Sequence, residues 1–330
     1  MKYNYSKICK SLLNDTQPRA KEVIERRFGL TDNSPETLEA IGKDFQITRE
    51  RVRQIQSRAI KQIKQAKATQ LSEIFSSFSV YITKNGGVVE QGKIIEDWGG
   101  EENKNQILFL LNLNTEFKFC TANKDFYAFW SNDDKAIKAV KNEVSNFIKF
   151  LKTKKVPVAL GEFESIQSND ILRNYISLSY HILTNKEGKY GLSTWPEVNP
   201  RNIRDKAYLA LKKGTAPLHF SEIYGIITKE HASVGKNILL QSVHNELIRN
   251  TEFVLIGRGI YALKEWGYEP GWVKDILAET LRKEKNGLDK DILIERVLSQ
   301  RKVKKSTILL NLTDKNYFLR DDDGKYILKA

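Results

Sequence analysis

One short segment crowds several kinds of hydrogen-bonding side chain together, Thr48-Arg49-Glu50-Arg51-Val52-Arg53-Gln54-Ile55. Wound as a helix, it separates apolar from polar side chains. The inward side is predicted to consist of Val52, Ile55, Ala59 and Ile63. The opposite side, near the N-terminal end, consists of Arg49, Glu50, Arg53 and Gln54. Arginine can donate two hydrogen bonds to guanine, glutamate can accept one from the amino group of cytosine, and glutamine can pair with adenine. The polar side therefore predicts base reading in a DNA major groove.

Three further basic residues lie towards the flanks of the same helix, where phosphate contacts would set the register without reading sequence. They are Arg51, Arg58 and Lys61. The alternative is a solvated helix face with internal ion pairs. One acid among so many bases at the reading end favours base contacts over that alternative.

Two preceding helices must position this segment. Apolar residues at helical spacing between residues 18 and 67 predict three helices. Gly29 ends the first, and Ser34, Pro35 and Thr37 supply start signals for the second. Thr48 can cap the third, and only Gln46 and Ile47 separate it from the second. So short a connection forces two helices to cross sharply, which predicts a helix-turn-helix.

The stretches PRAKEVIERRFGL and TLEAIGKDFQITRERVRQIQSRAIKQIK resemble the C-terminal region of primary sigma-70 family factors, known as region 4. The resemblance covers about 50 residues. It implies binding to the minus-35 promoter element and to the flap of the RNA polymerase β subunit. It places Arg49, Glu50 and Gln54 at base-reading positions, and Arg19, Arg27, Arg51 and Arg53 at positions that contact or support the DNA backbone. Only 17 residues precede the matching stretch, so we do not expect a complete sigma factor.

A weak repeat follows residue 70, marked by a tyrosine in a short β segment. The markers are Tyr127, Tyr190, Tyr261 and Tyr326, at intervals of 63, 71 and 65 residues. Each lies in a predicted hairpin that follows two or three helical stretches, which is the pattern of a winged helix. We therefore expect a mainly α fold with small β-hairpins, a helix-turn-helix followed by four tandem winged-helix domains. The predicted domains are 1–68, 69–132, 133–197, 198–268 and 269–330. Units this small are expected to pack on their neighbours.

The third repeat, APLHFSEIYGIITKE followed by SVHNELIRNTEFVLIGRGIYALKEWG, is similar to the HARE-type helix-turn-helix module. That resemblance implies a DNA- or polymerase-associated role. Possible DNA contacts in this copy are Lys236, Asn237, Gln241, His244 and Arg258. Solvent exposure alone explains these residue types equally well.

Charge supports a polyanion partner. The chain carries 54 Lys plus Arg against 41 Asp plus Glu, a net charge of +13. Residues 1 to 70 hold 8 Lys and 7 Arg against 3 Asp and 5 Glu, which is +7 of that excess.

With 40% hydrophobic and 29% charged residues, the composition is that of a soluble globular protein. No apolar run or signal core predicts a membrane or export, and two isolated cysteines, Cys9 and Cys120, fit a reducing cytoplasm.

No arrangement in the sequence predicts catalysis. Four histidines lack partners at metal-ligand spacing, and a phosphate-loop-like pattern at 87–93 fails because Ile94 stands where Ser or Thr must hold magnesium. We expect no enzyme activity, cofactor, metal or small-molecule substrate.

The leading hypothesis is a bacterial, cytoplasmic transcription factor that reads promoter-like double-stranded DNA and associates with RNA polymerase. One alternative is the DNA-recognition component of a restriction, defence or DNA-processing system. In another, the winged helices are protein-docking modules, because the first, second and fourth copies look only weakly basic.

Overall fold

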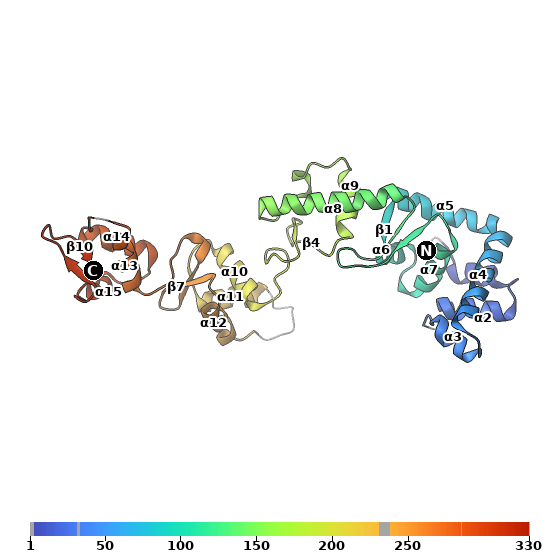
Figure 1. Cartoon of the computed structure of the whole chain (residues 1–330), viewed down its shortest axis with the longest axis horizontal. Coiled ribbons are helices and arrows are strands. Elements are labelled where there is room, and N and C mark those ends of the chain that lie inside the picture. Colours follow the sequence, from blue (N-terminus) through green and yellow to red (C-terminus); the bar gives the residue numbers. More distant parts are fainter. Residues whose placement is uncertain (1–2, 32–33, 231–237, 285, 330) are drawn as a thin grey trace. The chain divides into compact units, whose positions relative to one another are not determined.

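The computed structural model describes residues 3–31, 34–230, 238–284 and 286–329, apart from the side chain at position 70. The chain forms two compact units, Met1–Thr194 and Trp195–Ala330. Helices dominate both units, and the strands pair in small antiparallel sheets (Figure 1). The mainly α fold with small hairpins is therefore confirmed.

Four helices make up the N-terminal segment of the first unit. They are α1 (Tyr5–Leu13), α2 (Pro18–Phe28), α3 (Leu38–Asp44) and α4 (Arg49–Ala66). Gly29 ends α2 in the left-handed region at φ 63°, and its N–H donates to the carbonyl of Glu25. Hydroxyls of Thr37 and Thr48 accept backbone N–H groups at the starts of α3 and α4. The three helices predicted between residues 18 and 67 are confirmed, with Gly29, Thr37 and Thr48 at their ends. The start signals expected at Ser34 and Pro35 are wrong, because Thr37 caps α3 and both residues lie before it.

The sharp turn between α3 and α4 depends on two residues. Gln46 adopts the left-handed conformation at φ 52°, and the N–H of Ile47 then donates to the carbonyl of Gly42 over 2.9 Å. Gly42 lies where the helices approach most closely, since a Cβ built there would meet the carbonyl oxygen of Ile47 at 2.8 Å. Only a glycine fits without moving the backbone of the turn. The helix-turn-helix prediction is confirmed.

The next segment has the order helix, strand, helix, helix and hairpin. Its elements are α5 (Ala68–Lys84), β1 (Val88–Glu90), α6 (Gln91–Trp98), η1 (Glu101–Asn103), α7 (Lys104–Leu113), β2 (Lys118–Cys120) and β3 (Phe129–Ser131). The sheet order is β1-β3-β2, and both pairings are antiparallel. The three helices and the final hairpin follow the order predicted for 69–132, whereas the strand β1 between the first two helices was not predicted.

A single hydrophobic core joins these two segments. It contains Tyr5 and Leu12 of α1, Ile24 of α2, and Phe109 and Leu110 of α7. The ring of Phe109 also lies 5.0 Å from that of Phe28, centroid to centroid. The predicted boundary at residue 68 therefore divides one packed core, as expected for units too small to stand alone.

The segment after β3 repeats the pattern with a single turn in place of the second helix. Its elements are α8 (Asp134–Lys154), η2 (Leu160–Glu162), α9 (Asn169–Ser177), β4 (Ile182–Thr184) and β5 (Tyr190–Leu192). Here α9 packs against the preceding segment. The amide of Asn174 donates to the carbonyls of Asn85 and Val88 at 2.9 and 2.7 Å, and the Tyr175 hydroxyl donates to that of Gly86 at 2.7 Å.

The second unit contains two further copies of the pattern, of which the second has an isolated bridge between Leu288 and Tyr326 in place of the first strand. The first comprises α10 (Ile203–Gly214), β6 (Leu218–His219), α11 (Phe220–Glu230), α12 (Leu240–Arg249), β7 (Phe253–Gly257), β8 (Ile260–Leu263) and η3 (Lys264–Trp266). The second comprises α13 (Val273–Arg282), α14 (Lys290–Gln300), α15 (Lys305–Leu312), β9 (Phe318–Arg320) and β10 (Tyr326–Leu328). Tyr261 and Tyr326 are buried in the respective hydrophobic cores, so these two repeat markers pack against the helices of their own copies.

The shared core predicts that the first two segments unfold together. Phe109→Ala removes a fully buried ring and should lower the free energy of unfolding by about 3–5 kcal/mol. Hydrogen exchange measured by mass spectrometry should accelerate in α2 and α4 as well as in α6, because all three helices contribute to this core. Val80→Ala is the matched control, because Val80 is 65% exposed on the solvent side of α5. This variant should change neither the free energy of unfolding nor the rates of hydrogen exchange. Faster exchange confined to residues 69–132 would contradict a shared core.

Candidate nucleic-acid interface

The start of α4 presents its polar residues to solvent. Val52, Ala59 and Ile63 are buried and Ile55 is half-buried, so the predicted inward side is confirmed. The exposed residues of the first turns are Arg49, Glu50, Arg51, Arg53 and Gln54. The hydroxyl of Thr48 accepts the N–H of Arg51 at 3.2 Å and caps the helix just before them. The reading face, as we call these five residues, therefore lies on a well-defined helix end.

Two pairs of side chains within the reading face contact each other. Arg53 donates to both carboxylate oxygens of Glu50, at 2.8 and 2.7 Å, and Arg51 donates to the amide oxygen of Gln54 at 3.2 Å. The bond from Arg53 lowers the pKa of Glu50 below its usual value, so this carboxylate stays ionised at neutral pH. Both pairs are exposed to water, where such ion pairs contribute little and exchange readily. The internal ion pairs that the alternative interpretation required are present, yet they leave every partner at the surface.

Two other arginines predicted near the DNA backbone are held by the protein. Arg27 is half-buried and donates to the carbonyl of Glu36 at 2.7 Å. Arg19 is exposed, donates to the carbonyl of Phe45 at 3.4 Å, and lies 5.2 Å from the centre of the Phe45 ring. Arg27 is thus placed to support the segment before α3, whereas Arg19 remains accessible beside the turn. Arg58 and Lys61 lie exposed further along α4.

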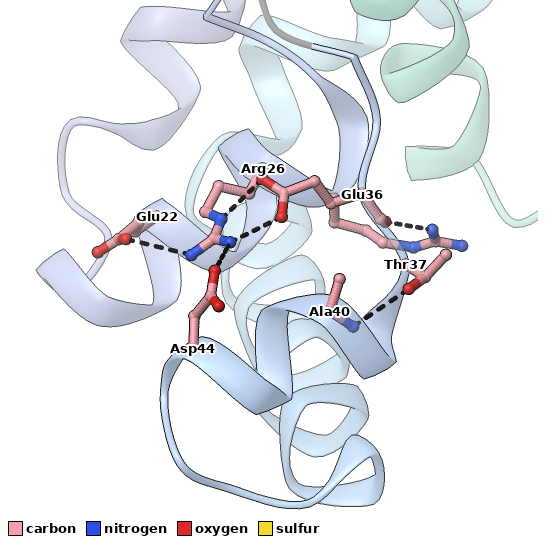
Figure 2. Close-up of polar contacts among 7 residues, drawn as sticks. Glu22, Arg26, Glu36, Thr37, Ala40 and Asp44 are labelled. Carbon is pink, nitrogen blue, oxygen red and sulfur yellow. Dashed lines mark hydrogen bonds and ion pairs between the residues drawn. The ribbon is translucent and has the colours of Figure 1, made fainter.

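Arg26, which the sequence analysis overlooked, ties α2 to both ends of α3 (Figure 2). Its guanidinium donates to the carboxylate of Glu36 at 2.8 and 2.7 Å and also to Asp44, and it lies 3.8 Å from Glu22. Glu36 precedes α3 and Asp44 is its last residue, so a single cation fixes the supporting helix. The sequence carried a signal for Glu22 alone, four residues before Arg26 on the same helix. Nothing in helical spacing indicates the other two partners.

The third helices of the winged-helix-like segments differ in accessibility. Most of α7 is buried in the core shared with α1 and α2, and α9 packs on the turn at Asn85–Gly87. By contrast, α12 exposes Leu240 and Ile248, and α15 begins beside the exposed Lys304 and Lys305. Residues 71 to 194 carry 15 Lys plus Arg against 15 Asp plus Glu, so this stretch has no net charge.

Of the possible contacts in the third copy, Lys236 and Asn237 lie outside the described residues. Gln241 is exposed and donates to the side chain of Asn245 at 3.0 Å. The half-buried ring of His244 stacks on Phe220 with 4.4 Å between centroids, so packing accounts for it. Arg258 is exposed between β7 and β8. The roles assigned to these residues in DNA binding stay predictions.

Two further features, a metal-ligand cluster and a membrane-spanning helix, are absent from the part of the chain that the structure describes. Within it, no three His, Cys, Asp or Glu side chains gather closely enough to hold a metal ion. None of its helices combines the length and the apolar character needed to cross a membrane.

Residues 12–65, from the end of α1 through α4, match the family described as Sigma-70, region 4. The RNA polymerase sigma factor SigA of Clostridium acetobutylicum is 45% identical over 53 residues, which is 16% of this chain and 14% of that protein. The RNA polymerase sigma factor RpoD of Helicobacter pylori (strain 26695) is 54% identical over 55 residues, 16% of this chain and 8% of that protein. The RNA polymerase sigma factor RpoD of Neisseria gonorrhoeae is 39% identical over 57 residues, which is 17% of this chain and 9% of that protein. The resemblance to sigma region 4 is therefore confirmed, over a small part of each relative's length.

The Arg26 cluster predicts a stability that depends on pH. Hydrogen bonding to Arg26 lowers the pKa of Glu36 below its ordinary value of 4.5. A pKa that is lower in the folded state than in the unfolded state stabilises the fold above pH 4.5, and that stabilisation disappears as the pH falls through the folded value. Glu36→Gln should therefore destabilise the protein at pH 7, and its difference from the wild type should shrink on acidification.

Urea unfolding of both proteins between pH 7 and pH 3 measures this difference. Glu39→Gln is the matched control, because Glu39 is an exposed glutamate in the first turn of α3. It should follow the wild type across the range. A Glu36→Gln difference that stays constant with pH would show that the ion pair with Arg26 does not stabilise the fold.

Proposed function

We propose that this chain is a DNA-binding transcription factor that reads minus-35-like promoter DNA with the reading face of α4. The observation that carries the proposal is a coincidence of two independent features. Residues 12–65 match Sigma-70, region 4, and within that stretch the hydrogen-bonding side chains at the start of α4 are exposed. A capped helix end with such side chains is the part of a helix-turn-helix that enters a major groove.

The proposed roles follow from the placement of each residue. Arg49, Glu50 and Gln54 read bases, and DNA would exchange the contacts of Glu50 with Arg53 and of Gln54 with Arg51 for contacts of its own. The backbone contacts are assigned to the exposed cations on α4 and beside the turn. These are Arg19, Arg51, Arg53, Arg58 and Lys61. Arg27 acts through the carbonyl of Glu36 as a positioning residue.

We also propose that the chain associates with RNA polymerase through this segment. The support is that the matching relatives are RNA polymerase sigma factors. The flap of the β subunit is the partner surface that the family resemblance implies. Binding to polymerase and to promoter DNA together would make the chain a regulator of transcription initiation.

The four segments after the helix-turn-helix are proposed to be winged-helix domains with divided roles. The first two act as a scaffold, because their third helices α7 and α9 pack against the rest of the first unit and residues 71 to 194 have no net charge. The third and fourth keep accessible third helices, so contacts with DNA or with protein are assigned to them. This division is a specific form of the docking-module hypothesis.

Single substitutions should separate base reading from phosphate binding. Arg49→Ala or Glu50→Ala should relax the preference at one base pair and lose roughly 1–3 kcal/mol on the preferred sequence. Arg51→Ala should weaken all sequences alike and reduce the slope of log affinity against log salt by about one. Fluorescence anisotropy measures both effects on a duplex that carries a minus-35-like element and on its single-base-pair variants.

Lys138→Ala is the matched control for charge, since Lys138 is exposed on α8 within the stretch of zero net charge. It should leave affinity and salt slope unchanged. If Glu50→Ala and Arg51→Ala lower affinity equally on every sequence, direct base reading by α4 is wrong.

Association with polymerase predicts a defined co-purification. The tagged full chain should retain the polymerase β subunit from a native extract of its own cells. The Glu50→Ala variant should retain as much β subunit as the wild type, because Glu50 is proposed to contact a base and not the polymerase. Recovery of a nuclease without the β subunit would contradict the proposal and favour the DNA-processing alternative.

A further inference from the structure

A groove of about 490 Å³ lies within the second unit, between strand β7 and the residues that lead into α13. Its lining is mostly apolar. The lining includes Leu255, Arg258, Trp272 and Arg301. β7 is the edge strand of the sheet β6-β8-β7, and the N–H of Lys302 donates to the carbonyl of Ile256 at 2.7 Å. This hydrogen bond joins the fourth winged-helix-like segment to the third, beside the groove.

Large apolar side chains stand open at this groove. Trp272 is 82% exposed and Leu255 is 49% exposed. A tryptophan left so open to water is unusual in a soluble protein, and tryptophan and arginine are the residues that contribute most where proteins bind each other. The apolar lining therefore offers a contact surface rather than a finished core.

The groove also holds a buried cation, Arg301, for which the described residues provide no carboxylate at ion-pair distance. Arg301 is 4% exposed, and the hydrogen bonds that the structure describes for its guanidinium go to the carbonyls of Gln300, Glu269 and Gly271. Its Nε is buried and has no hydrogen-bond partner among the described residues. Burial lowers the pKa of Arg301, while Asp275 and Glu269 act on its charge from beyond ion-pair distance.

The charge at the groove is one-sided. Within the described part of the chain, its lining contains Arg258 and Arg301 and no Asp or Glu. Asp275, the acid on the neighbouring helix, accepts the N–H of Trp272 at 2.6 Å and so serves the start of α13. Hydrogen bonds to carbonyls satisfy most of the Arg301 guanidinium but do not neutralise its charge, and an occupant that brings a carboxylate would offset part of the cost of burying that charge.

We propose that this groove docks an extended acidic segment of a partner protein, in which an apolar side chain lies next to a carboxylate. The apolar side chain packs against Trp272 and Leu255. The carboxylate pairs with the exposed guanidinium of Arg258, in a groove that the buried cation Arg301 also lines. The groove belongs to the second unit and the reading face to the first, so the two can be tested separately.

The test uses the full chain and a fluorescein-labelled peptide, Leu-Asp-Phe-Asp-Leu with a blocked C-terminus. Anisotropy should show saturable binding below about 1 mM, and the matching peptide with Asn in place of Asp should bind about tenfold more weakly or not at all. Trp272→Ala and Arg258→Gln should each weaken the acidic peptide about tenfold. Both side chains are exposed, so both variants should keep the fold, and Trp272→Ala should also keep its affinity for DNA.

Leu310→Ala is the matched control, because Leu310 is 71% exposed on α15 of the same unit and does not line the groove. It should bind the acidic peptide as the wild type does. The proposal is overturned by an absence of saturable binding up to about 1 mM, by equal binding of the Asp and Asn peptides, or by equal losses in Trp272→Ala and Leu310→Ala. None of these results depends on whether α4 reads DNA.

Discussion

The arrangement of the first unit depends on the burial of helix α7 against α1 and α2. In a winged helix that binds DNA, the third helix lies at the surface. Here α7 contributes Phe109 and Leu110 to a core that it shares with Tyr5 and Ile24. Because apolar burial is the main favourable term in folding, this contact holds the helix-turn-helix on the following segment. The same contact removes α7 from any role at the surface and leaves the reading face of α4 as the candidate DNA contact in this unit.

The reading face combines rigid placement with weak side-chain pairing. Its backbone is fixed by the Thr48 cap, by the close approach of Gly42 to the turn, and by the contacts of Arg26 with both ends of α3. Its side chains, by contrast, form ion pairs and hydrogen bonds in full contact with water. Such pairs contribute little to the stability of the fold, so their exchange for base contacts would cost little free energy. A helix positioned by its buried side, with exchangeable partners on its outer side, suits sequence recognition.

Local sequence signals predicted the elements of this fold well, and the contacts between elements poorly. Gly29, Thr37 and Thr48 act within one turn of their own positions, so their capping roles could be predicted from type and spacing alone. Apolar periodicity identified the buried side of α4 but could not say which helix covers a given face. Packing between neighbouring units was therefore expected from their size alone, whereas the burial of α7 against α1 and α2 was not predicted.

The same limit applies to single polar residues. Arg26 lies 10 residues from Glu36 and 18 from Asp44, and Asn174 lies 89 residues from Asn85. Pairing at such separations is decided by packing and not by spacing. His244 shows the converse, since a polar type on a predicted recognition helix proves to stack against Phe220. The exposed polar face of α4 was predictable because exposure needs no partner.

The joint between α4 and α5 determines how DNA binding would act on the rest of the first unit. Lys67 alone separates the two helices; its N–H donates to the carbonyl of Ile63, and its ammonium group pairs with Asp15 at 2.7 Å. One residue held by a hydrogen bond and an ion pair cannot serve as a flexible linker, which needs several freely rotating residues. The first two winged-helix-like segments would therefore be held in a fixed orientation on any DNA that α4 binds. A partner docked on the second unit would in turn be tethered to that DNA by the same chain, and tethering raises its effective concentration there without a new contact.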